Sequence, residues 1–344
     1  MAVFSCKPYD KEFFEKAAAD LDLKFRFEFF EPLLEKSTVR LAEGFDAVCV
    51  FVNDKVDADV ISALSSYGIK LIVLRCAGFN NVDVEKAAEL GVTVARVPAY
   101  SPHAVAEHAV ALMLSLNRRI PQAWAKTRNG NFSLVGQLGF DMVGKRVGII
   151  GTGLIGGITA EILKKGFRCD VVAFDVQRSA QLEGCGISYV SLDELFRTCD
   201  ILSLHAPLLP STQHIINAES IAKMKPGVMI INTSRGGLIH TQSLIDGLKN
   251  KQIGYAGLDV YCKEGPYMFE DLSHAGIDDD VFARLMTFPN VIVTAHQAFF
   301  TMEALTVISQ TTLRNADGAH RGLGPPRQGE LDTVVRHAPT ASKL

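Results

Sequence analysis

The sequence lacks any uncharged apolar run approaching the roughly 18 residues that a membrane-spanning helix needs. It also lacks a marked excess of one charge, because 35 Lys and Arg residues oppose 38 Asp and Glu residues. We therefore expect neither a membrane-spanning protein nor a basic protein that binds nucleic acid or anionic membranes. The first residues contain no long apolar segment and soon include acids, which argues against a secretory signal or a transit peptide.

Closely spaced cysteines are also missing. The seven cysteines are odd in number and include no C-x-x-C pair. Zinc sites and the disulfide frameworks of small secreted proteins both depend on regularly spaced cysteines. The scattered thiols are typical of a protein in a reducing compartment, and we expect no metal site.

What is present indicates a folded protein of about two domains. The chain has 344 residues, of which 48% are hydrophobic and 21% are charged. Short apolar runs alternate with helical patterns, which predicts parallel sheets with helices on both faces. The predicted fold class is therefore α/β, with two doubly wound parallel-sheet domains. The predicted strands are Ala2–Ser5, Ala47–Phe51, Leu71–Arg75 and Thr93–Arg96 in the first domain, and Val147–Ile150, Val171–Phe174, Ile201–His205, Val228–Asn232, Gly257–Val260 and Val291–Thr294 in the second.

Two long helical patterns suggest how the domains are connected. One begins at Pro102, a favoured first residue of a helix, and the other covers Thr301–Asn315. Too few residues follow the second helix to build a third domain, so we expect it to return to the first. The predicted substrate domain comprises residues 1–101 and 299–335, and a dinucleotide-binding (Rossmann) domain of residues 102–298 is inserted in it. Residues 336–344 are expected to form an exposed tail.

A glycine-rich segment marks the start of the second domain. Residues 145–157 read KRVGIIGTGLIGG, which places the G-x-G-x-x-G pattern on Gly151, Gly153 and Gly156 between a predicted strand and a predicted helix. Such a loop binds the pyrophosphate of a dinucleotide at the helix N-terminus. Asp175 stands 19 residues after Gly156, where an acid is expected to bind the adenosine ribose. Because Asp175 would repel a 2′-phosphate, the pattern favours NAD over NADP.

Three polar residues follow predicted strands of the same domain. Arg235, Glu264 and His296 each come soon after a strand end, the edge at which open α/β sheets bind ligands. An arginine can pair with a carboxylate, and a histidine oriented by a carboxylate can transfer a proton. Together they would suffice to reduce a 2-keto acid with a nicotinamide. Taken singly, Arg235 could cap a helix, Glu264 could be a solvated acid and His296 a buried structural histidine.

Ten segments in order over nearly the whole chain carry a family pattern: AVFSCKPYD, VCVFVND, LRCAGFNNVD, RVPAYSPHAVAEHAVAL, GIIGTGLIG, AFDV, LHAPL, MIINTSRGGLI, GLDVY and TAHQAFFT. With these segments the chain resembles the NAD-dependent D-2-hydroxyacid dehydrogenases, most closely the fermentative D-lactate dehydrogenases. The resemblance implies a split substrate domain around a nucleotide domain, NAD as cofactor, and a homodimer. It also implies a small-molecule 2-keto acid substrate and no nucleic-acid or membrane partner.

The resemblance implies roles for individual residues. Arg235 corresponds to the arginine that binds the substrate carboxylate and keto oxygen, His296 to the proton donor, and Glu264 to its acidic partner. Further correspondences imply substrate contacts at Ala77, Gly78, Tyr100 and Phe299. They also imply cofactor contacts at Gly151, Gly153, Leu154, Ile155, Gly156, Asp175, His205, Ala206, Pro207, Thr233, Ser234 and Asp259.

The expected reaction is the reversible reduction of pyruvate to D-lactate with NADH. Two alternatives remain open at this point: a dehydrogenase for a bulkier 2-keto acid, and an NAD-sensing binding protein of the same fold. The last residues, Ser342, Lys343 and Leu344, match the S-K-L address that a peroxisomal import receptor reads. We therefore expect a peroxisomal or glycosomal location, with a cytoplasmic location as the alternative.

Overall fold

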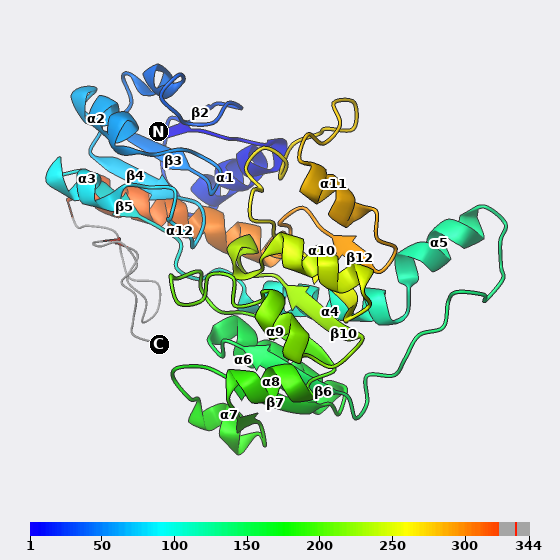
Figure 1. The fold of residues 1–344 in the computed structure, drawn as a ribbon. Helices are drawn as coiled ribbons and strands as arrows, with labels where there is room; N and C mark the ends of the chain where they lie inside the picture. Colours follow the sequence, from blue (N-terminus) through cyan, green and yellow to red (C-terminus); the bar gives the residue numbers. More distant parts are fainter. Residues whose placement is uncertain (323–333, 336–344) are drawn as a thin grey trace. The chain divides into compact units, whose positions relative to one another are not determined.

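The computed structural model describes residues 1–322 and 334–335 (Figure 1). The chain divides into two compact units: Met1–Ser101 together with the segment that begins at Phe300, and Pro102–Phe299. The boundary falls after Phe299, one residue later than the sequence suggests. No helix among the described residues is both long and apolar enough to span a bilayer.

The first unit contains a five-stranded parallel sheet in the order β2-β1-β3-β4-β5. All four predicted strands are confirmed, although each ends one or two residues earlier than predicted. The short edge strand β2 was not predicted, because two residues give no detectable periodicity. The strands are β1 (Ala2–Val3), β2 (Glu28–Phe29), β3 (Ala47–Val50), β4 (Leu71–Leu74) and β5 (Thr93–Ala95).

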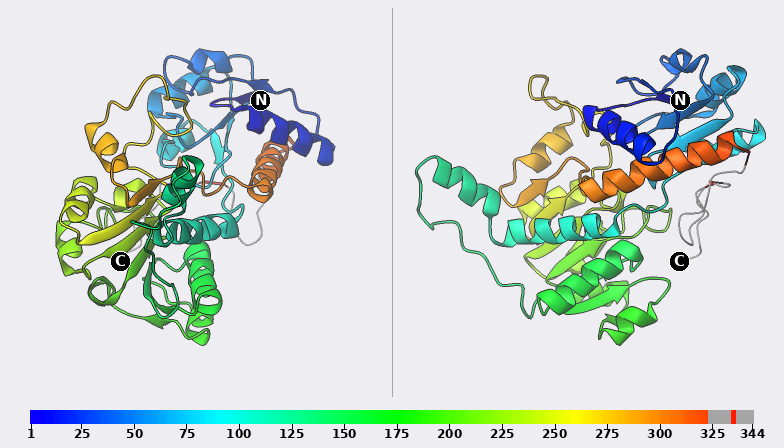
Figure 2. Two further views of the ribbon diagram at one scale, coloured as in Figure 1. Left: turned by 90° about the vertical axis from the view of Figure 1, so that its right-hand side faces the viewer. Right: turned by 180° about the vertical axis from the view of Figure 1, so that it is seen from behind.

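Helices cover both faces of this sheet. Helices α1 (Pro8–Asp20) and α12 (Met302–His320) pack side by side, and both contribute to one apolar cluster with β1, β3 and β4 (Figure 2). Val48 and Ile72 are fully buried but lie outside that cluster, on the alternate positions of their strands. The other face is therefore covered too. The remaining helical segments of this unit are η1 (Val39–Ala42), α2 (Ala58–Ser66) and α3 (Val84–Glu89).

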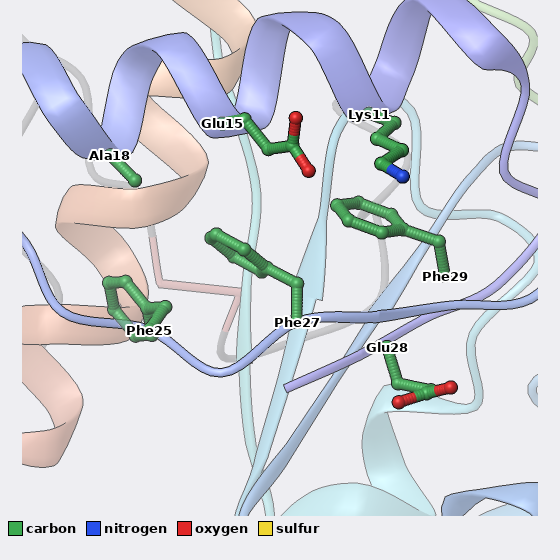
Figure 3. Close-up of a pocket in the computed structure, with 7 residues that line it drawn as sticks. All are labelled: Lys11, Glu15, Ala18, Phe25, Phe27, Glu28 and Phe29. Atoms are coloured by element: carbon green, nitrogen blue, oxygen red, sulfur yellow. The ribbon is translucent and has the colours of Figure 1, made fainter.

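An open pocket of about 590 Å³ lies between α1 and the β2 segment (Figure 3). Phe25, Phe27 and Phe29 line it on one side, and Lys11 and Glu15 of α1 lie on the other. The phenylalanines alternate along an extended segment, so their rings share one face and pack on the apolar cluster. Strand β2 is at the opposite edge of the sheet from β5, so this pocket is separate from the loops that follow β4 and β5.

The second unit contains a seven-stranded parallel sheet in the order β12-β11-β10-β9-β6-β7-β8. The six predicted strands are present, and the two-residue edge strand β8 is an addition. The chain starts at β6, proceeds outward to β7 and β8, and then returns to build β9 to β12 on the other side. This reversal beside β6 is where such sheets bind ligands. The strands are β6 (Arg146–Ile150), β7 (Asp170–Phe174), β8 (Ser188–Tyr189), β9 (Ile201–Leu204), β10 (Val228–Asn232), β11 (Ile253–Leu258) and β12 (Val291–Val293).

Two apolar layers enclose this sheet. Helices α4 and α6 bury one layer, and α8 to α11 bury the other. The long helix predicted from Pro102 is confirmed as α4, but a separate helix, α5, follows Arg119, whose φ of 51° ends α4. The helical segments are α4 (Pro102–Asn117), α5 (Ile120–Arg128), α6 (Leu154–Glu161), η2 (Ile162–Gly166), α7 (Ala180–Gly184), α8 (Leu192–Thr198), α9 (Ala218–Lys223), η3 (Gly236–Leu238), α10 (Thr241–Lys249) and α11 (Asp280–Met286).

Candidate active site

The three glycines of the loop and first turn of α6 differ in the space around them. Gly151 has a φ of +92°, and a Cβ there would lie 2.6 Å from the Ala206 nitrogen. A Cβ on Gly156 would lie 1.9 Å from the Gly151 carbonyl oxygen, so only glycine lets the helix start so close to the strand. Around Gly153 nothing lies within 4 Å of a Cβ position. The loop thus leaves open space at the middle glycine, where the backbone of such loops approaches a pyrophosphate.

Asp175 follows β7 and is joined to this loop. Its Oδ2 accepts hydrogen bonds from the Thr152 nitrogen at 2.5 Å and from Thr152 Oγ1 at 3.1 Å. A mostly apolar cavity of about 220 Å³ adjoins it, of a size and character that suit an aromatic base. The cavity is lined by Ile150, Gly151, Phe174, Asp175, Val176, Leu192, Ala206, Pro207, Leu209, Ser211, Thr212 and Ile215. The neighbouring Leu154 and Ile155 form the first turn of α6.

The loops after β9 and β10 carry most of the other predicted cofactor residues, and Asp259 follows β11. Ser234 Oγ donates a hydrogen bond to the Ala206 carbonyl at 2.7 Å, which joins the two loops. Thr233 Oγ1 is buried and has no hydrogen-bond partner within residues 1–322 and 334–335. An unsatisfied buried hydroxyl is rare and suggests that a ligand supplies the partner. The residues present therefore fit a dinucleotide.

His205 lies close to the glycine loop. Its Nε2 lies 2.8 Å from Ser203 Oγ, and its Cβ would be 3.2 Å from a Cβ on Gly156. Desolvation by burial lowers the pKa of His205 to about 4. The imidazole is therefore neutral at physiological pH, so it adds no positive charge to the dinucleotide site.

His296 and Glu264 form a direct pair. His296 Nδ1 lies 3.0 Å from Glu264 Oε1, and both side chains are only partly buried. Glu264 Oε2 also accepts a hydrogen bond from the Tyr261 nitrogen at 3.2 Å, which fixes the carboxylate. With Nδ1 donating to the carboxylate, Nε2 is the ring nitrogen left to exchange a proton with a substrate.

The backbone of His296 is held in an unusual conformation by Asp259. His296 has a φ of 52°, and its nitrogen donates to the Asp259 carbonyl at 2.8 Å. The Asp259 carboxylate is fully buried and accepts hydrogen bonds from Thr294 Oγ1 at 2.5 Å and from the backbone nitrogens of Gln297 and Ala298, each at 2.9 Å. Asp259 therefore fixes the backbone on both sides of His296.

A histidine on α4 completes this network, although no local sequence pattern links it to Asp259. His108 Nε2 lies 3.0 Å from Thr294 Oγ1 and 3.5 Å from Asp259 Oδ1. Burial acts to raise the pKa of Asp259, but hydrogen bonds from His108, Thr294 and the Ala298 nitrogen outweigh it and lower the pKa. Asp259 is therefore ionised. The contact between His108 and Asp259 can be recognised only when α4, β11 and β12 are known to be neighbours.

Arg235 follows β10, whose neighbour β11 precedes Glu264, and β12, which precedes His296, lies on the other side of β11. Its Nη1 donates to the Ser234 carbonyl at 2.8 Å, and no carboxylate among the described residues forms an ion pair with it. A Cβ on the next residue, Gly236, would lie 2.0 Å from the Tyr261 carbonyl carbon. Glycine at this position lets the segment after Arg235 pack directly against the segment that leads to Glu264.

The structure therefore places all three predicted reactive residues on loops that follow adjacent strands β10, β11 and β12 of the second unit. Phe299 is the last residue of the same unit. Ala77, Gly78 and Tyr100 belong to the first unit, Ala77 and Gly78 in the loop after β4 and Tyr100 in the segment after β5.

Comparison with known proteins identifies the family. The model of the NAD-binding domain of D-isomer specific 2-hydroxyacid dehydrogenases matches residues 110–298. The D-lactate dehydrogenase of Escherichia coli is 50% identical over 328 residues, which cover 95% of this chain and 99% of that protein. Among solved structures, the pyruvate reductase of Chlamydomonas reinhardtii superimposes with a TM-score of 0.89 at 47% identity, covering 95% of this chain and 97% of that one.

A more distant structure bears on the cofactor. D-lactate dehydrogenase from Aquifex aeolicus, solved with NAD and lactic acid, has a TM-score of 0.82 at 30% identity and covers 94% of this chain and 96% of its own. The glycine loop, the cavity beside Asp175 and the His296–Glu264 pair agree with these likenesses. The chain belongs to the NAD-dependent D-isomer specific 2-hydroxyacid dehydrogenase family.

Proposed function

We propose that this protein is a D-lactate dehydrogenase, which catalyses pyruvate + NADH + H⁺ ⇌ D-lactate + NAD⁺. The observation that carries the proposal is the 3.0 Å pair of His296 and Glu264, together with Arg235 on the loop after β10, which has no carboxylate partner among the described residues. An oriented acid–base group and a guanidinium that no carboxylate neutralises are what the reduction of a 2-keto acid requires. The names of the similar proteins from Escherichia coli and Chlamydomonas reinhardtii support pyruvate as the substrate.

In this mechanism Arg235 binds the substrate carboxylate and polarises the keto oxygen. When bound, NADH would supply the hydride for reduction of the keto carbon. Protonated His296 delivers a proton from Nε2 to the forming alkoxide, while Nδ1 keeps its contact with Glu264. Glu264 stabilises the imidazolium before transfer, and Asp259 holds the backbone that positions the ring. In the reverse direction neutral His296 accepts the proton of the lactate hydroxyl.

The cofactor and substrate contacts follow from the same proposal. Gly151, Gly153 and Gly156 would accommodate the pyrophosphate and Asp175 the ribose hydroxyls. The remaining proposed cofactor contacts are Leu154, Ile155, His205, Ala206, Pro207, Thr233, Ser234 and Asp259. The proposed substrate contacts besides Arg235 are Ala77, Gly78, Tyr100 and Phe299.

An assay of NADH oxidation against a panel of 2-keto acids tests the proposal. We expect the highest kcat/KM with pyruvate, and D-lactate as the product in chiral analysis. A higher kcat/KM with a branched or aromatic 2-keto acid would show that the preferred substrate is bulkier than pyruvate. Absence of turnover with every 2-keto acid, together with tight NADH binding, would contradict catalysis and favour an NAD-sensing protein.

We also propose that the protein is a homodimer assembled through the second unit. Large apolar side chains are exposed along α5 and the segment that follows it, which extends away from the sheet of its own unit (Figure 1). Trp124 is 62% exposed, Phe132 76% and Leu138 88%. Contiguous apolar exposure of this kind is typical of an interface. A second copy is the proposed partner, because the family resemblance implies a dimer.

Sedimentation equilibrium tests this assembly. We expect a dimer at micromolar concentration, and a shift toward monomer in the Phe132→Lys, Leu138→Lys double variant. Leu41→Lys changes an exposed leucine of the first unit and should leave the dimer intact. A monomeric unmutated protein would contradict the proposal.

Finally, we propose import into peroxisomes or glycosomes by a receptor that binds Ser342, Lys343 and Leu344 where these form the free C-terminus. These three residues lie outside the part of the chain that the structure describes. Deleting them should move an N-terminally tagged protein from peroxisomes to the cytosol of a eukaryotic cell and leave kcat and KM unchanged. Cytosolic fluorescence of the tagged full chain would contradict import and favour a cytoplasmic location.

A further inference from the structure

In the loop after β4, the carbonyl groups of Ala77 and Gly78 accept hydrogen bonds from side chains. Arg96 Nη1 donates to the Ala77 carbonyl at 2.7 Å, and Cys76 Sγ donates to the Gly78 carbonyl at 3.2 Å. Within the described residues, no hydrogen bond is donated by the backbone nitrogens of Ala77, Gly78 or Phe79. Half-buried backbone N–H groups without partners are available to a ligand, and an anion is the ligand they favour.

The direction of these N–H groups is set by the contacts of the carbonyls. Peptide groups are planar and these are trans, so a carbonyl and the N–H of the next residue point in opposite directions. The contact of Arg96 with the Ala77 carbonyl therefore turns the Gly78 N–H away from the guanidinium. In the same way, the thiol contact turns the Phe79 N–H away from Cys76. Two neighbouring donors are thus fixed by side chains on the far side of the loop.

Arg96 is itself held firmly in place. Its carbonyl accepts a hydrogen bond from Asn315 Nδ2 of α12 at 3.0 Å, and its guanidinium lies 5.1 Å from the centre of the Phe79 ring. The next residue, Val97, donates from its nitrogen to the Cys76 carbonyl at 3.2 Å. The segments after β4 and β5 are therefore linked at several points, and the guanidinium has little freedom to leave the Ala77 carbonyl.

The charge of the half-buried Arg96 is not neutralised, which distinguishes it from the buried Arg75 that follows β4. Arg75 pairs with Asp10 at 3.2 Å, whereas no carboxylate among the described residues pairs with Arg96. Burial lowers the pKa of Arg96, but an arginine remains charged under physiological conditions. An unpaired, partly desolvated cation makes its surroundings favourable for an anion.

We propose that Arg96 is a positioning residue for the substrate carboxylate: it fixes the Ala77–Gly78 peptide and, through its charge, strengthens the Gly78 N–H as a donor. A cation that donates to the carbonyl of a peptide polarises that peptide and makes its N–H more positive. This inference rests on the proposed function, in which the loop at Ala77 and Gly78 contacts the carboxylate. It assigns the recognition of that carboxylate to two arginines, Arg235 directly and Arg96 through the backbone.

Steady-state kinetics of two Arg96 variants test this role. Arg96→Met removes the charge and the donor, and we expect the KM for pyruvate to rise about tenfold, because a hydrogen bond involving a charged group is lost. Arg96→Gln keeps a donor for the Ala77 carbonyl without the charge, and it should raise the KM by a smaller factor. In both variants kcat should stay within about threefold and the KM for NADH should not change, since the reactive pair and the glycine loop are intact. Inhibition by oxamate, a pyruvate analogue, should weaken in parallel.

Arg40→Met is the matched control, because Arg40 is an exposed arginine of the same unit. It should leave every constant unchanged. A pyruvate KM within twofold of the unmutated value in Arg96→Met would overturn the inference. If that variant does not fold, an unchanged KM in Arg96→Gln would overturn it instead. A fall in kcat and NADH affinity with an unchanged pyruvate KM would mean a merely structural role. If the unmutated protein reduces no 2-keto acid, the proposed function itself fails, and this inference fails with it.

Discussion

The glycine loop and the reactive cluster of the second unit are built in opposite ways. The loop lies within six consecutive residues, Gly151 to Gly156, and its geometry depends on Gly151 and Gly156, which no other residue could replace without a clash. The cluster is spread from Arg235 to His296 and depends on side chains brought together by three adjacent strands. A backbone site can therefore be read from local sequence, whereas a side-chain site needs the order of the strands. The two should also be separable by mutation.

The largest expected effect comes from substitutions in the reactive cluster, which should abolish most catalysis and leave the glycine loop intact. His296→Ala and Arg235→Ala should each lower kcat/KM for pyruvate by about 10²–10⁴, because an oriented acid or the carboxylate clamp is lost. Binding of NADH, followed by fluorescence, should change little, since neither side chain builds the glycine loop. Arg235→Lys should restore little activity, because an ammonium cannot make the planar two-point contact. Near-normal turnover in either alanine variant would refute the assigned roles.

The second prediction concerns the choice of cofactor beside the glycine loop and leaves the reactive cluster unchanged. Asp175 would face the 2′-phosphate of NADPH, so the unmutated protein should strongly prefer NADH. Asp175→Asn removes the charge but can still accept from the Thr152 nitrogen, and it should narrow the preference by about tenfold, the size of a lost short-range repulsion. The ratio of kcat/KM for the two cofactors measures this. Equal use of both cofactors by the unmutated protein would contradict it.

A third prediction concerns the coupling inside the reactive cluster. Glu264→Gln keeps the shape of the side chain that lies 3.0 Å from His296 Nδ1 but removes its negative charge. We expect kcat/KM for pyruvate to fall by roughly tenfold, because a charge-assisted contact that orients the ring is weakened. Binding of NADH should stay unchanged. An unchanged kcat/KM in this variant would show that Glu264 is not the partner.

The smallest effect concerns stability rather than catalysis. The pKa of His205 is about 4 in the folded protein, below the value of about 6.5 for an exposed histidine, so the unfolded chain binds the extra proton first as the pH falls. Stability should therefore decline between about pH 6.5 and pH 4, by on the order of 2 kcal/mol at pH 5 from this residue. His205→Gln removes that contribution. The drop in Tm from pH 7.5 to pH 5 should be smaller in the variant, and an equal drop would exclude His205 as its source.

Sequence prediction succeeded where a pattern repeats or a backbone constraint is local. The strands of both sheets and the helix from Pro102 follow from periodicity, because buried strands need apolar runs and α4 begins with a residue suited to that position. Strands β2 and β8 escaped prediction, because two residues have no period. The helix α5 escaped it because its residues are mostly exposed and carry no apolar stripe.

The sequence by itself determined the parallel α/β architecture, the glycine loop and the acid that follows it, since these depend on the chain within about 25 residues. It also carried the segments by which the family was recognised. Only the tertiary structure decided that His108, Asp259 and Thr294 hold the backbone of His296, and that Arg96 holds the carbonyl of Ala77. These contacts join residues that are far apart in the chain. Hydrogen bonds between them depend on which strands are neighbours and on the exact course of the loops, and no local pattern records either.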